Sequence, residues 1–153
     1  MWALCACSHW SSFVKIEIRK SQSCEFASAL TQENMKAYYE IRSIQWNSEQ
    51  FAKSWEEFEN FDIYLESKLI GVLRFSYGNS NCYIRDLQIE SNVQGKGIGK
   101  YCLNYATRFA KDRGDNCIKL RVFSENPAIK LYSNHGFEKV SESKGLMVMS
   151  LSI

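Results

Sequence analysis

Proline is almost absent from this chain and glycine is sparse, since one proline and eight glycines stand among 153 residues. This composition excludes a collagen-like, linker-rich or intrinsically disordered protein. The net charge of +2 is too small to indicate a nucleic-acid-binding protein by itself. Hydrophobic residues make up 45% of the chain and charged residues 24%, and the length suits one domain with a substantial core.

The sequence also lacks the patterns of metal sites and disulfide frameworks. Its six cysteines form no CxxC pair, and only Cys5 and Cys7 have a histidine, His9, close by. Because a zinc site needs four ligands at suitable spacing, we predict no metal. Three other cysteines fall inside apolar segments, which indicates free buried thiols and a reducing, cytoplasmic setting: Cys82, Cys102 and Cys117.

Targeting and membrane segments are not indicated either. The apolar residues 1–7 are too short for a signal peptide and lack a basic flank. No apolar run approaches the length that crosses a bilayer. We therefore expect residues 1–12 to be a loose tail and residues 13–153 to form a single domain, with no membrane partner.

The clearest helix start lies at Asn47, whose side chain is suited to accept a hydrogen bond from the first turn. Gln50 occupies the third helical position, and Trp46 is placed to pack on Phe51 as a hydrophobic staple. An apolar stripe then recurs at helical spacing and is expected to face the core: Phe51, Trp55 and Phe58.

Strands and helices alternate through the rest of the chain. Apolar patterning predicts strands over residues 13–19, 61–66, 69–77, 82–89, 117–123, 137–142 and 146–151. It predicts further helices over residues 31–44, 97–113 and 126–135, and a tight turn at Ser67-Lys68. The buried face of the long third helix is expected to hold Ile98, Tyr101, Cys102, Tyr105, Ala106, Phe109 and Ala110. A connecting helix makes the fourth and fifth strands parallel, so we predict an α/β (α+β) fold with a mixed sheet of about seven strands and four helices.

A glycine-rich turn stands between the fourth strand and the helix that follows it: Gln94-Gly95-Lys96-Gly97-Ile98-Gly99-Lys100. The first four backbone N–H groups of a helix have no internal partner, and the helix dipole adds partial positive charge there. Glycine has no Cβ, so an anion is able to approach the main chain closely. The turn therefore predicts a diphosphate-binding site, with Lys96 and Lys100 near enough to help neutralise the phosphates.

The spacing of this turn excludes two common nucleotide motifs. A Walker A motif needs four residues between its first glycine and a Gly-Lys pair, followed by Ser or Thr. Here three residues separate Gly95 from Gly99-Lys100, and Tyr101 follows. The GxGxxG pattern fails as well, because neither Gly95 nor Gly97 has a glycine five residues later. A nucleotide-binding module is therefore disfavoured.

The pattern that does match is Gln/Arg-x-x-Gly-x-Gly/Ala, filled here by Gln94, Gly97 and Gly99. In this pattern the chain resembles the GNAT superfamily of N-acetyltransferases. A second segment carries the resemblance further: residues 126–132, Asn-Pro-Ala-Ile-Lys-Leu-Tyr, followed by Gly136-Phe137, look like another signature of that family. The order of the predicted strands and helices also fits over nearly the whole chain.

The resemblance implies a sheet that splays between its fourth and fifth strands and a reaction that moves an acetyl group from acetyl-CoA to an amine. The backbone N–H of Ile89 would hold the thioester carbonyl, and the pantetheine arm would pair with the strand as an added strand does. The turn would hold the diphosphate. The implied cofactor-binding residues are Leu87, Ile89, Gln94, Gly95, Lys96, Gly97, Ile98, Gly99, Lys100, Asn126 and Ala128.

Acetyl transfer also needs a proton donor for the leaving thiolate and a base for the amine. A primary amine with a pKa near 10.4 is only about one part in a thousand neutral at pH 7. By resemblance, Tyr132 is the general acid. The family fixes no position for the base, and we predict Glu90, with Asp86 and a water chain as alternatives. Asp86 is equally well explained by a structural ion pair, and Glu90 by solvent exposure. In a regular strand Asp86 and Glu90 share one face and Tyr83 and Arg85 lie on the other, but a bulge near the cofactor would change this arrangement.

The sequence leaves the acceptor amine open. Residues 33–66 hold eight acids and three bases, together with the aromatic residues Tyr38, Tyr39, Trp46, Trp55 and Phe58. Such a wall suits a cationic small amine, while a protein lysine or N-terminus fits the same description. Arg85 would instead favour an acceptor that carries a carboxylate. A rival function is that of a catalytically inactive CoA-binding sensor or scaffold. We expect a monomer or homodimer and no nucleic-acid partner.

Overall fold

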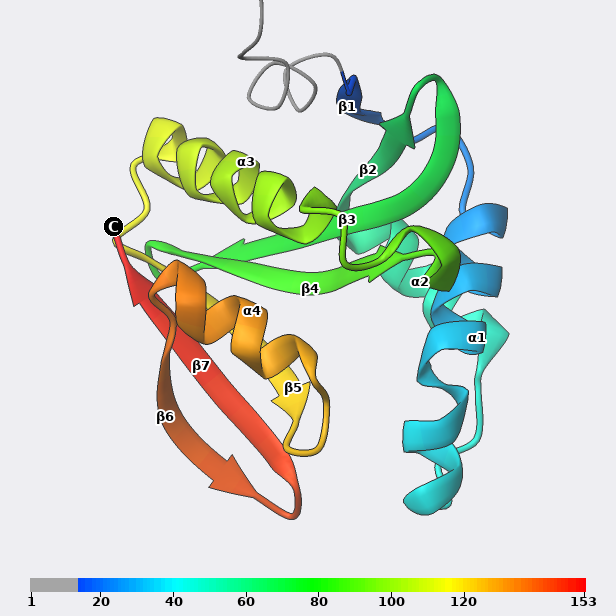
Figure 1. The fold of residues 1–153 in the computed structure, drawn as a ribbon. Coiled ribbons are helices and arrows are strands. Elements are labelled where there is room, and N and C mark those ends of the chain that lie inside the picture. Colours follow the sequence, from blue (N-terminus) through cyan, green and yellow to red (C-terminus); the bar gives the residue numbers. More distant parts are fainter. Residues whose placement is uncertain (1–13) are drawn as a thin grey trace, which may run out of the picture.

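Seven strands form one mixed sheet in the computed structural model, which describes residues 14–153 (Figure 1). The strand order is β1-β2-β3-β4-β5-β7-β6. Every neighbouring pair is antiparallel except β4 and β5, which are parallel. Four α-helices accompany the sheet in this part of the chain. The predicted mixed sheet with four helices is therefore confirmed.

Most element bounds agree with the prediction to within a few residues. The strands are β1 (Ile16–Lys20), β2 (Glu59–Leu65), β3 (Lys68–Gly78), β4 (Asn81–Ile89), β5 (Cys117–Phe123), β6 (Glu138–Ser143) and β7 (Leu146–Ser152). The helices are α1 (Glu25–Ile41), α2 (Ser48–Glu57), α3 (Ile98–Arg113) and α4 (Ala128–His135), with a 3-10 turn η2 (Ser91–Val93). None of the described helices has both the length and the hydropathy of a membrane span. The predicted tail, residues 1–12, lies outside the described residues, and so do Cys5, Cys7 and His9.

Helix α1 begins earlier than the sequence predicts. Apolar spacing places it over residues 31–44, whereas the helix runs from Glu25 to Ile41. The residue before it, Cys24, forms no side-chain capping hydrogen bond, and the N–H of Glu25 reaches Ser23 Oγ only at 3.4 Å, so no strong cap marks the start. Ala27 is fully buried and packs in one cluster with Val72 of β3. Packing on the sheet, rather than a cap, therefore decides where this helix begins.

The start of α2 agrees with the prediction. A backbone N–H of its first turn donates to Asn47 Oδ1 at 2.9 Å, and the rings of Trp46 and Phe51 lie 5.3 Å apart. Phe51 is buried, whereas Trp55 and Phe58 are half-buried. The predicted core-facing stripe is therefore complete only at its first position.

Two tight turns join the meander of β2, β3 and β4. Glu66 and Ser67 form the first turn, and Asn79 and Ser80 form the second, all four with positive φ. This backbone is that of type I′ turns, whose twist matches the twist of the flanking strands. The first turn lies one residue before the predicted Ser67-Lys68, because Lys68 already belongs to β3.

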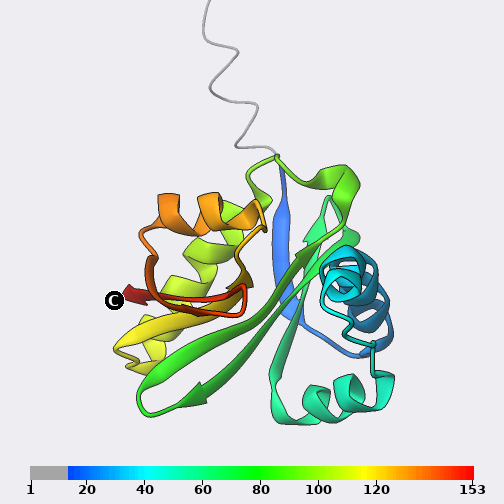
Figure 2. The same ribbon diagram turned by 90° about the horizontal axis from the view of Figure 1, so that it is seen from below.

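Helices cover both faces of the sheet. Figure 2 shows α1 and α2 on one face of its β2–β4 half, while α3 and α4 cover the opposite face. Two clusters of buried residues correspond to these layers. The larger cluster packs α3 and α4 on the sheet, and the smaller one packs α1 and α2 on it. The central strand β4 therefore lies between two helical layers.

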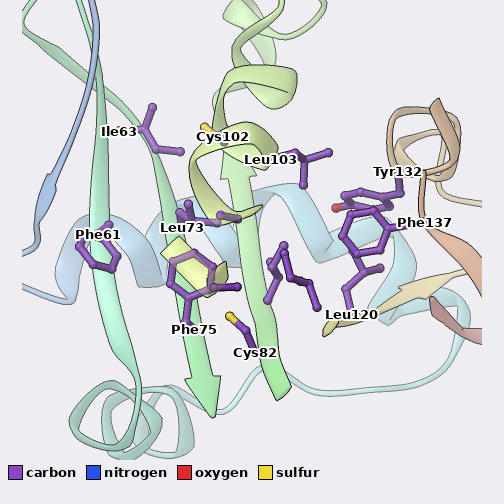
Figure 3. Packing of buried hydrophobic residues seen from close by; sticks show 14 of the residues in the cluster. Phe61, Ile63, Leu73, Phe75, Cys82, Cys102, Leu103, Leu120, Tyr132 and Phe137 are labelled. Atoms are coloured by element: carbon purple, nitrogen blue, oxygen red, sulfur yellow. The ribbon is translucent and has the colours of Figure 1, made fainter. Parts of the chain in front are cut away.

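The larger cluster fills the space between α3 and the strands (Figure 3). Cys102 and Leu103 of α3 belong to it, together with Leu73 and Phe75 of β3. Tyr101 was expected on this buried face of α3, but its side chain is 43% exposed. Leu103, which the pattern did not include, is buried instead.

The cysteines of the described residues are free, as predicted. Cys82 and Cys102 are fully buried, and burial raises the pKa of each thiol to about 12. Cys117 is only half-buried, and its thiol donates to Asn81 Oδ1 at 2.8 Å. The two buried thiols therefore behave as small apolar groups of the core.

Candidate active site

Strands β4 and β5 pair along their first halves only. Their last paired residues are Ile84 and Leu120, although β4 continues to Ile89 and β5 continues to Phe123. Beyond that point β4 pairs only with β3, and β5 only with β7. The facing edges of the two strands are therefore open, and the predicted splay between the fourth and fifth strands is confirmed.

A β-bulge interrupts β4 where the strands separate. Arg74 of β3 faces Asp86, and the next pair along is Phe75 with Ile84, so Arg85 is the extra residue. A bulge of this kind shifts the alternation of side chains by one position. The residues after it therefore face the opposite way from those of a regular strand.

The bulge brings Arg85 and Asp86 to the same face of the sheet. Asp86 forms an ion pair with Arg74, whose guanidinium lies 5.1 Å from the ring centre of Phe58. The guanidinium of Arg85 lies 5.4 Å from the same ring centre. The arrangement expected for a regular strand, with Tyr83 and Arg85 opposite Asp86, is therefore wrong, and the alternative of a bulge near the cofactor is the one present.

The glycine-rich turn leads from η2 into α3. Gly97 precedes the helix with φ 82°, in the left-handed region that favours glycine. The N–H of Tyr101 donates to Gly97 O at 3.1 Å. A Cβ added to Gly97 would meet no atom within 4 Å, so the space beside the turn is open. The free N–H groups at the start of α3 therefore border a space that an anion is able to enter.

Gly99 has a packing role that the motif alone does not reveal. A Cβ at this position would lie 2.7 Å from Leu131 Cδ2 of α4. Glycine therefore allows the first turn of α3 to approach α4 closely. The two segments that carry the family motifs are held together at this contact.

One carbonyl ties the end of β4 to α1 and to the glycine-rich turn. Ile89 O accepts hydrogen bonds from Asn34 Nδ2 at 3.1 Å and from Gln94 Nε2 at 2.8 Å. The N–H of Glu90 donates to Ile70 O of β3 at 2.8 Å. Because neighbouring residues of a strand direct their N–H groups to opposite edges, the N–H of Ile89 points to the open side. An added chain would pair with it there.

These features meet in one cleft of about 950 Å³ whose walls come from α1, β4, the turn, β5 and α4. The general-acid candidate Tyr132 lines it. So do most of the predicted cofactor-binding residues, namely Leu87, Ile89, Gln94, Gly95, Gly97, Ile98, Gly99, Lys100, Asn126 and Ala128. Lys96 does not belong to the lining. The structure therefore brings the two motif segments and the open edge of β4 to one place.

Asn126 and Pro127 directly precede α4, whose first residue is Ala128. Asn126 Oδ1 accepts the N–H of Ala128 at 2.9 Å, and Pro127 between them has helical backbone angles. The helix ends at Gly136, whose φ of 110° lies in the left-handed region. These local signals fix both ends of the short helix that carries Tyr132.

Tyr132 is buried, with 8% of its surface exposed, and lines the cleft. Its ring packs edge-on against Phe137 with the ring centres 5.9 Å apart. Figure 3 shows its hydroxyl pointing toward the central strands. Burial, and to a lesser extent the negative charge of Asp86, raises the pKa of Tyr132 to about 12. The hydroxyl therefore stays protonated at neutral pH and is able to donate a hydrogen bond into the cleft.

Asp86 belongs to a buried polar network that the sequence did not reveal. Arg74 is only 1% exposed. It donates at 2.8 Å to Asp86 Oδ2 and to Ser54 Oγ, and at 2.9 Å to Asn60 Oδ1. The alternative of a structural ion pair for Asp86 is thus confirmed. Burial raises the pKa of Asp86, although the positive charge of Arg74 acts in the opposite direction.

The expected acceptor wall is only partly present at the cleft. Tyr38 and Tyr39 of α1 line it, whereas Trp46, Trp55 and Phe58 do not. Trp55 and Phe58 pack instead around the guanidinium of Arg74, which lies 5.4 and 5.1 Å from their ring centres. Trp46 packs on Tyr39 and Phe51. Of the eight acids between residues 33 and 66, only Glu33 lines the cleft.

Glu90, the predicted base, lies beside the cleft rather than in its lining. It borders a smaller cavity of about 330 Å³ between α1 and the end of β4. Glu33, Asn34 and Ser91 line both cavities, so the two are adjacent. Asp86 lines the main cleft. The assignment of the base to Glu90 stays a prediction.

Phe123, at the end of β5, forms part of the cleft wall, although no pattern in the sequence indicates it. Its ring stacks on that of Tyr38 at 5.8 Å and lies 3.9 Å below the guanidinium of Arg42. Arg42 donates to the two carboxylate oxygens of Glu125 at 2.6 and 2.8 Å. These contacts join α1 to the loop after β5. The paired residues are 83 positions apart, so no local pattern signals the contact.

A model of the acetyltransferase (GNAT) family matches residues 20–137 of this chain. Streptothricin acetyltransferase from Streptomyces lavendulae is 35% identical over 75 residues, in an alignment that covers 47% of this chain and 40% of that protein. The matched segments span less than half the length of the curated relatives. The sequence similarity therefore concerns the family and one part of those proteins.

Solved structures share the fold over nearly the whole chain. A domain from Methanocaldococcus jannaschii has a TM-score of 0.78 at 22% identity, covering 92% of this chain and 99% of that chain. The PaiA N-acetyltransferase from Thermoplasma acidophilum, solved in complex with coenzyme A, has a TM-score of 0.73 at 19% identity and covers 91% and 99%. At these identities the likeness concerns the fold alone.

Proposed function

The chain belongs to the GNAT acetyltransferase family, and from this premise we propose that it transfers the acetyl group of acetyl-CoA to an amine by direct attack on the thioester. One observation carries the proposal: the open edge of β4, the glycine-rich turn and Tyr132 line the same cleft. The reaction needs all three, as a channel for the pantetheine arm, a site for the diphosphate and a proton donor for the leaving sulfur.

The cleft has the space and the donors that acetyl-CoA requires. The diphosphate would lie at the start of α3, where Lys100 adds positive charge. The pantetheine arm would pair with Leu87 and Ile89, and the N–H of Ile89 would donate to the thioester carbonyl oxygen. Asn126 and Ala128 border the same path. Acetyl-CoA supplies the activated acyl group and a thiolate leaving group.

The amine must lose a proton, and we favour Asp86 over Glu90 as the group that accepts it. Asp86 lines the cleft, whereas Glu90 borders the neighbouring cavity. The pKa of Asp86 is raised by burial, which makes it a stronger base than an exposed carboxylate. Tyr132 would donate to the sulfur as the thioester bond breaks. A water chain that leads to Glu90 is the alternative route for the proton.

Two classes of acceptor are compatible with the proposed acetyl transfer: a small amine, and a protein lysine or N-terminus. We propose residues 13–153 as the catalytic domain, acting as a monomer or homodimer in the cytoplasm. The rival function, an inactive CoA-binding sensor, would use the turn and the open edge of β4 but would not need Tyr132.

Thermal unfolding and thiol release together test the proposed function. Acetyl-CoA and CoA are expected to raise the melting temperature, while ATP and NAD leave it unchanged. Release of free CoA thiol is then measured across a panel of amines, with loss of the amine as a second readout. Stabilisation by CoA without thiol release from any amine would contradict acetyl transfer and support the sensor.

A further inference from the structure

Two arginines flank the point where β4 and β5 separate. Arg85 and Arg121 follow directly after Ile84 and Leu120, the last paired residues of the two strands. Ile84 and Leu120 both belong to the core under α3, so the next residue on each strand faces the side of α1 and α2. Both arginines line the cleft. Arg85 on β4 and Arg121 on β5 therefore lie on either side of the opening between the two strands, on the same face of the sheet.

Contacts on β4 and on β5 support the placement of both arginines on the face of the sheet that α1 and α2 cover. The Arg85 guanidinium lies 5.4 Å from the ring centre of Phe58, which follows α2, and Arg85 Nε donates to Ser76 Oγ at 2.6 Å. On β5, Phe123 lies two residues after Arg121 and stacks on Tyr38 of α1. The ring centre of Tyr83 is also near, at 5.1 Å from the Arg85 guanidinium. Phe58, Tyr83 and Ser76 lie outside the lining of the cleft, and no hydrogen bond within residues 14–153 uses the two terminal nitrogens of Arg85.

The two arginines differ from the other arginines near the cleft. Arg42 is paired with Glu125, and Arg74 is paired with Asp86. Within residues 14–153, no carboxylate forms an ion pair with Arg85 or Arg121. Two cationic groups with free donors therefore border the acceptor side of the cleft.

The acids of the cleft do not balance these charges. Among the described residues that line the cleft, the carboxylates are Glu33 and Asp86. Asp86 forms its ion pair with Arg74, and the charge of Arg85 acts on it only from a longer distance. The phosphates of CoA are not a partner for the arginines either, because the glycine-rich turn lies at the start of α3, which covers the opposite face of the sheet. The charge at the opening calls for an anionic group on the acceptor.

We propose that Arg85 and Arg121 bind a carboxylate of the acceptor, so that the substrate class is a small amine that also carries a carboxylate, such as an amino acid. A guanidinium binds a carboxylate through two parallel N–H donors, which fixes its orientation as well as its charge. This inference rests on the proposed acetyl transfer to an amine. It replaces the purely cationic acceptor suggested by the acids of residues 33–66.

The acceptor is small because α1 and the loops across the cleft are joined. Arg42 of α1 bonds Glu125 in the loop after β5 and donates to Gly145 O at 3.3 Å in the turn between β6 and β7. Phe123 and Tyr38 close together beneath this bridge. An extended polypeptide would have to break these contacts to pass between α1 and the β6–β7 turn.

Matched pairs of amines test the inference. Each L-amino acid is compared with the amine formed by removing its carboxylate, for example lysine with cadaverine and phenylalanine with phenethylamine. We expect the wild-type protein to acetylate the carboxylate-bearing member of at least one pair with kcat/KM about tenfold higher or more. Arg85→Gln and Arg121→Gln are each expected to lower kcat/KM for that member by about ten- to a hundredfold, mainly through KM. The decarboxylated member should be unaffected.

Lys119→Gln is the matched control, because Lys119 stands on β5 with the same side-chain parity but pairs with Tyr83 and does not line the cleft. Arg121→Lys keeps the charge without the planar fork and should retain part of the preference. The inference is overturned if the decarboxylated amines react equally well, if the arginine variants slow both members of a pair alike, or if Lys119→Gln lowers the preference for the carboxylate-bearing member as much as the arginine variants do. Absence of thiol release from every amine, in a protein that CoA stabilises, would instead overturn the proposed acetyl transfer.

Discussion

Tyr132 and Asp86 face the same cleft, and burial shifts the pKa of both in the same direction. A tyrosine with a pKa of about 12 holds its proton through the whole physiological range. A carboxylate with a raised pKa binds a proton more readily than an exposed one. In the proposed mechanism the pair would therefore supply a hydrogen-bond donor and a proton acceptor to the same space.

Replacement of the Tyr132 hydroxyl tests the donor. In Tyr132→Phe we expect kcat to fall by about a hundredfold, because the leaving sulfur loses its hydrogen-bond donor. The dissociation constant of CoA, measured by calorimetry, should stay nearly the same. Tyr105→Phe is the control, since Tyr105 is a partly buried tyrosine of α3 that does not line the cleft. Equal turnover in Tyr132→Phe and the wild type would refute the assignment.

The pH dependence of kcat/KM distinguishes the two candidate bases. Activity should rise with pH as the base loses its proton, and burial raises the pKa of Asp86, so that rise occurs at higher pH than for an exposed carboxylate. Asp86→Asn is expected to lose this acidic limb and about a hundredfold in rate. Glu90→Gln is expected to keep the limb. Because Asp86→Asn leaves Arg74 without its charged partner, its melting temperature and CoA affinity must be measured alongside. A lost limb in Glu90→Gln would favour the original prediction.

At the scale of elements, the cleft depends on three places where a strand or helix departs from regular geometry. The splay stops the pairing of β4 with β5 at Ile84 and Leu120. The bulge at Arg85 turns Asp86 toward the cleft. The left-handed Gly97 directs the first turn of α3 to the open side. Each exposes backbone or side-chain groups that a regular strand or helix would have paired or buried.

Gly97→Ala tests the geometry of the turn. The φ of 82° is strained for any residue with a Cβ, so we expect a loss of about 1 kcal/mol in unfolding free energy and weaker CoA binding. Chemical denaturation and calorimetry measure the two effects. Gly78→Ala is the matched control, because Gly78 also has open space for a Cβ but no positive φ. Unchanged CoA affinity in Gly97→Ala would contradict the placement of the diphosphate at this turn.

At the scale of the whole molecule, α3 and the sheet enclose two thiols whose ionisation opposes folding. Cys82 and Cys102 have pKa values of about 12 in the folded protein, raised chiefly by burial, against about 8.5 in an unfolded chain. Between these values the unfolded chain has lost the proton and the folded chain has kept it. The free energy of unfolding is therefore not reduced by the thiols below about pH 8, and above that pH it falls by about 1.4 kcal/mol per pH unit for each thiol.

Denaturant unfolding between pH 8 and pH 10 measures this loss. The two thiols contribute equally to the slope of the unfolding free energy against pH, so Cys102→Ala should remove about half of their contribution. This holds whatever the effect of the substitution on stability at pH 7. Tyr132, whose pKa is also raised to about 12, adds to the slope only above about pH 10. A free energy of unfolding that does not fall from pH 8 to pH 10 would show that the two thiols are not buried as described.

Local patterns in the sequence were sufficient for most of the elements. The cap at Asn47 and the helix that begins at the glycine-rich turn each depend on residues close together in the chain, and both agree with the prediction. The start of helix α1 differed from the prediction, because Ala27 packs on a strand that lies far along the sequence. Hydrophobic spacing alone does not reveal such a contact.

The sequence by itself determined the family and the mixed sheet, and it supplied the predictions of a CoA site at the glycine-rich turn and of a role for Tyr132, because these follow from short motifs and from the period of apolar residues. Only the tertiary structure decided the acceptor side. The bulge determines which face of the sheet Asp86 lies on. The aromatic rings of α2 pack around Arg74 and not in the cleft, and Phe123 of β5 stacks on Tyr38 of α1. These outcomes depend on contacts between residues far apart in the chain, and such contacts exist only once the sheet and its helices have packed.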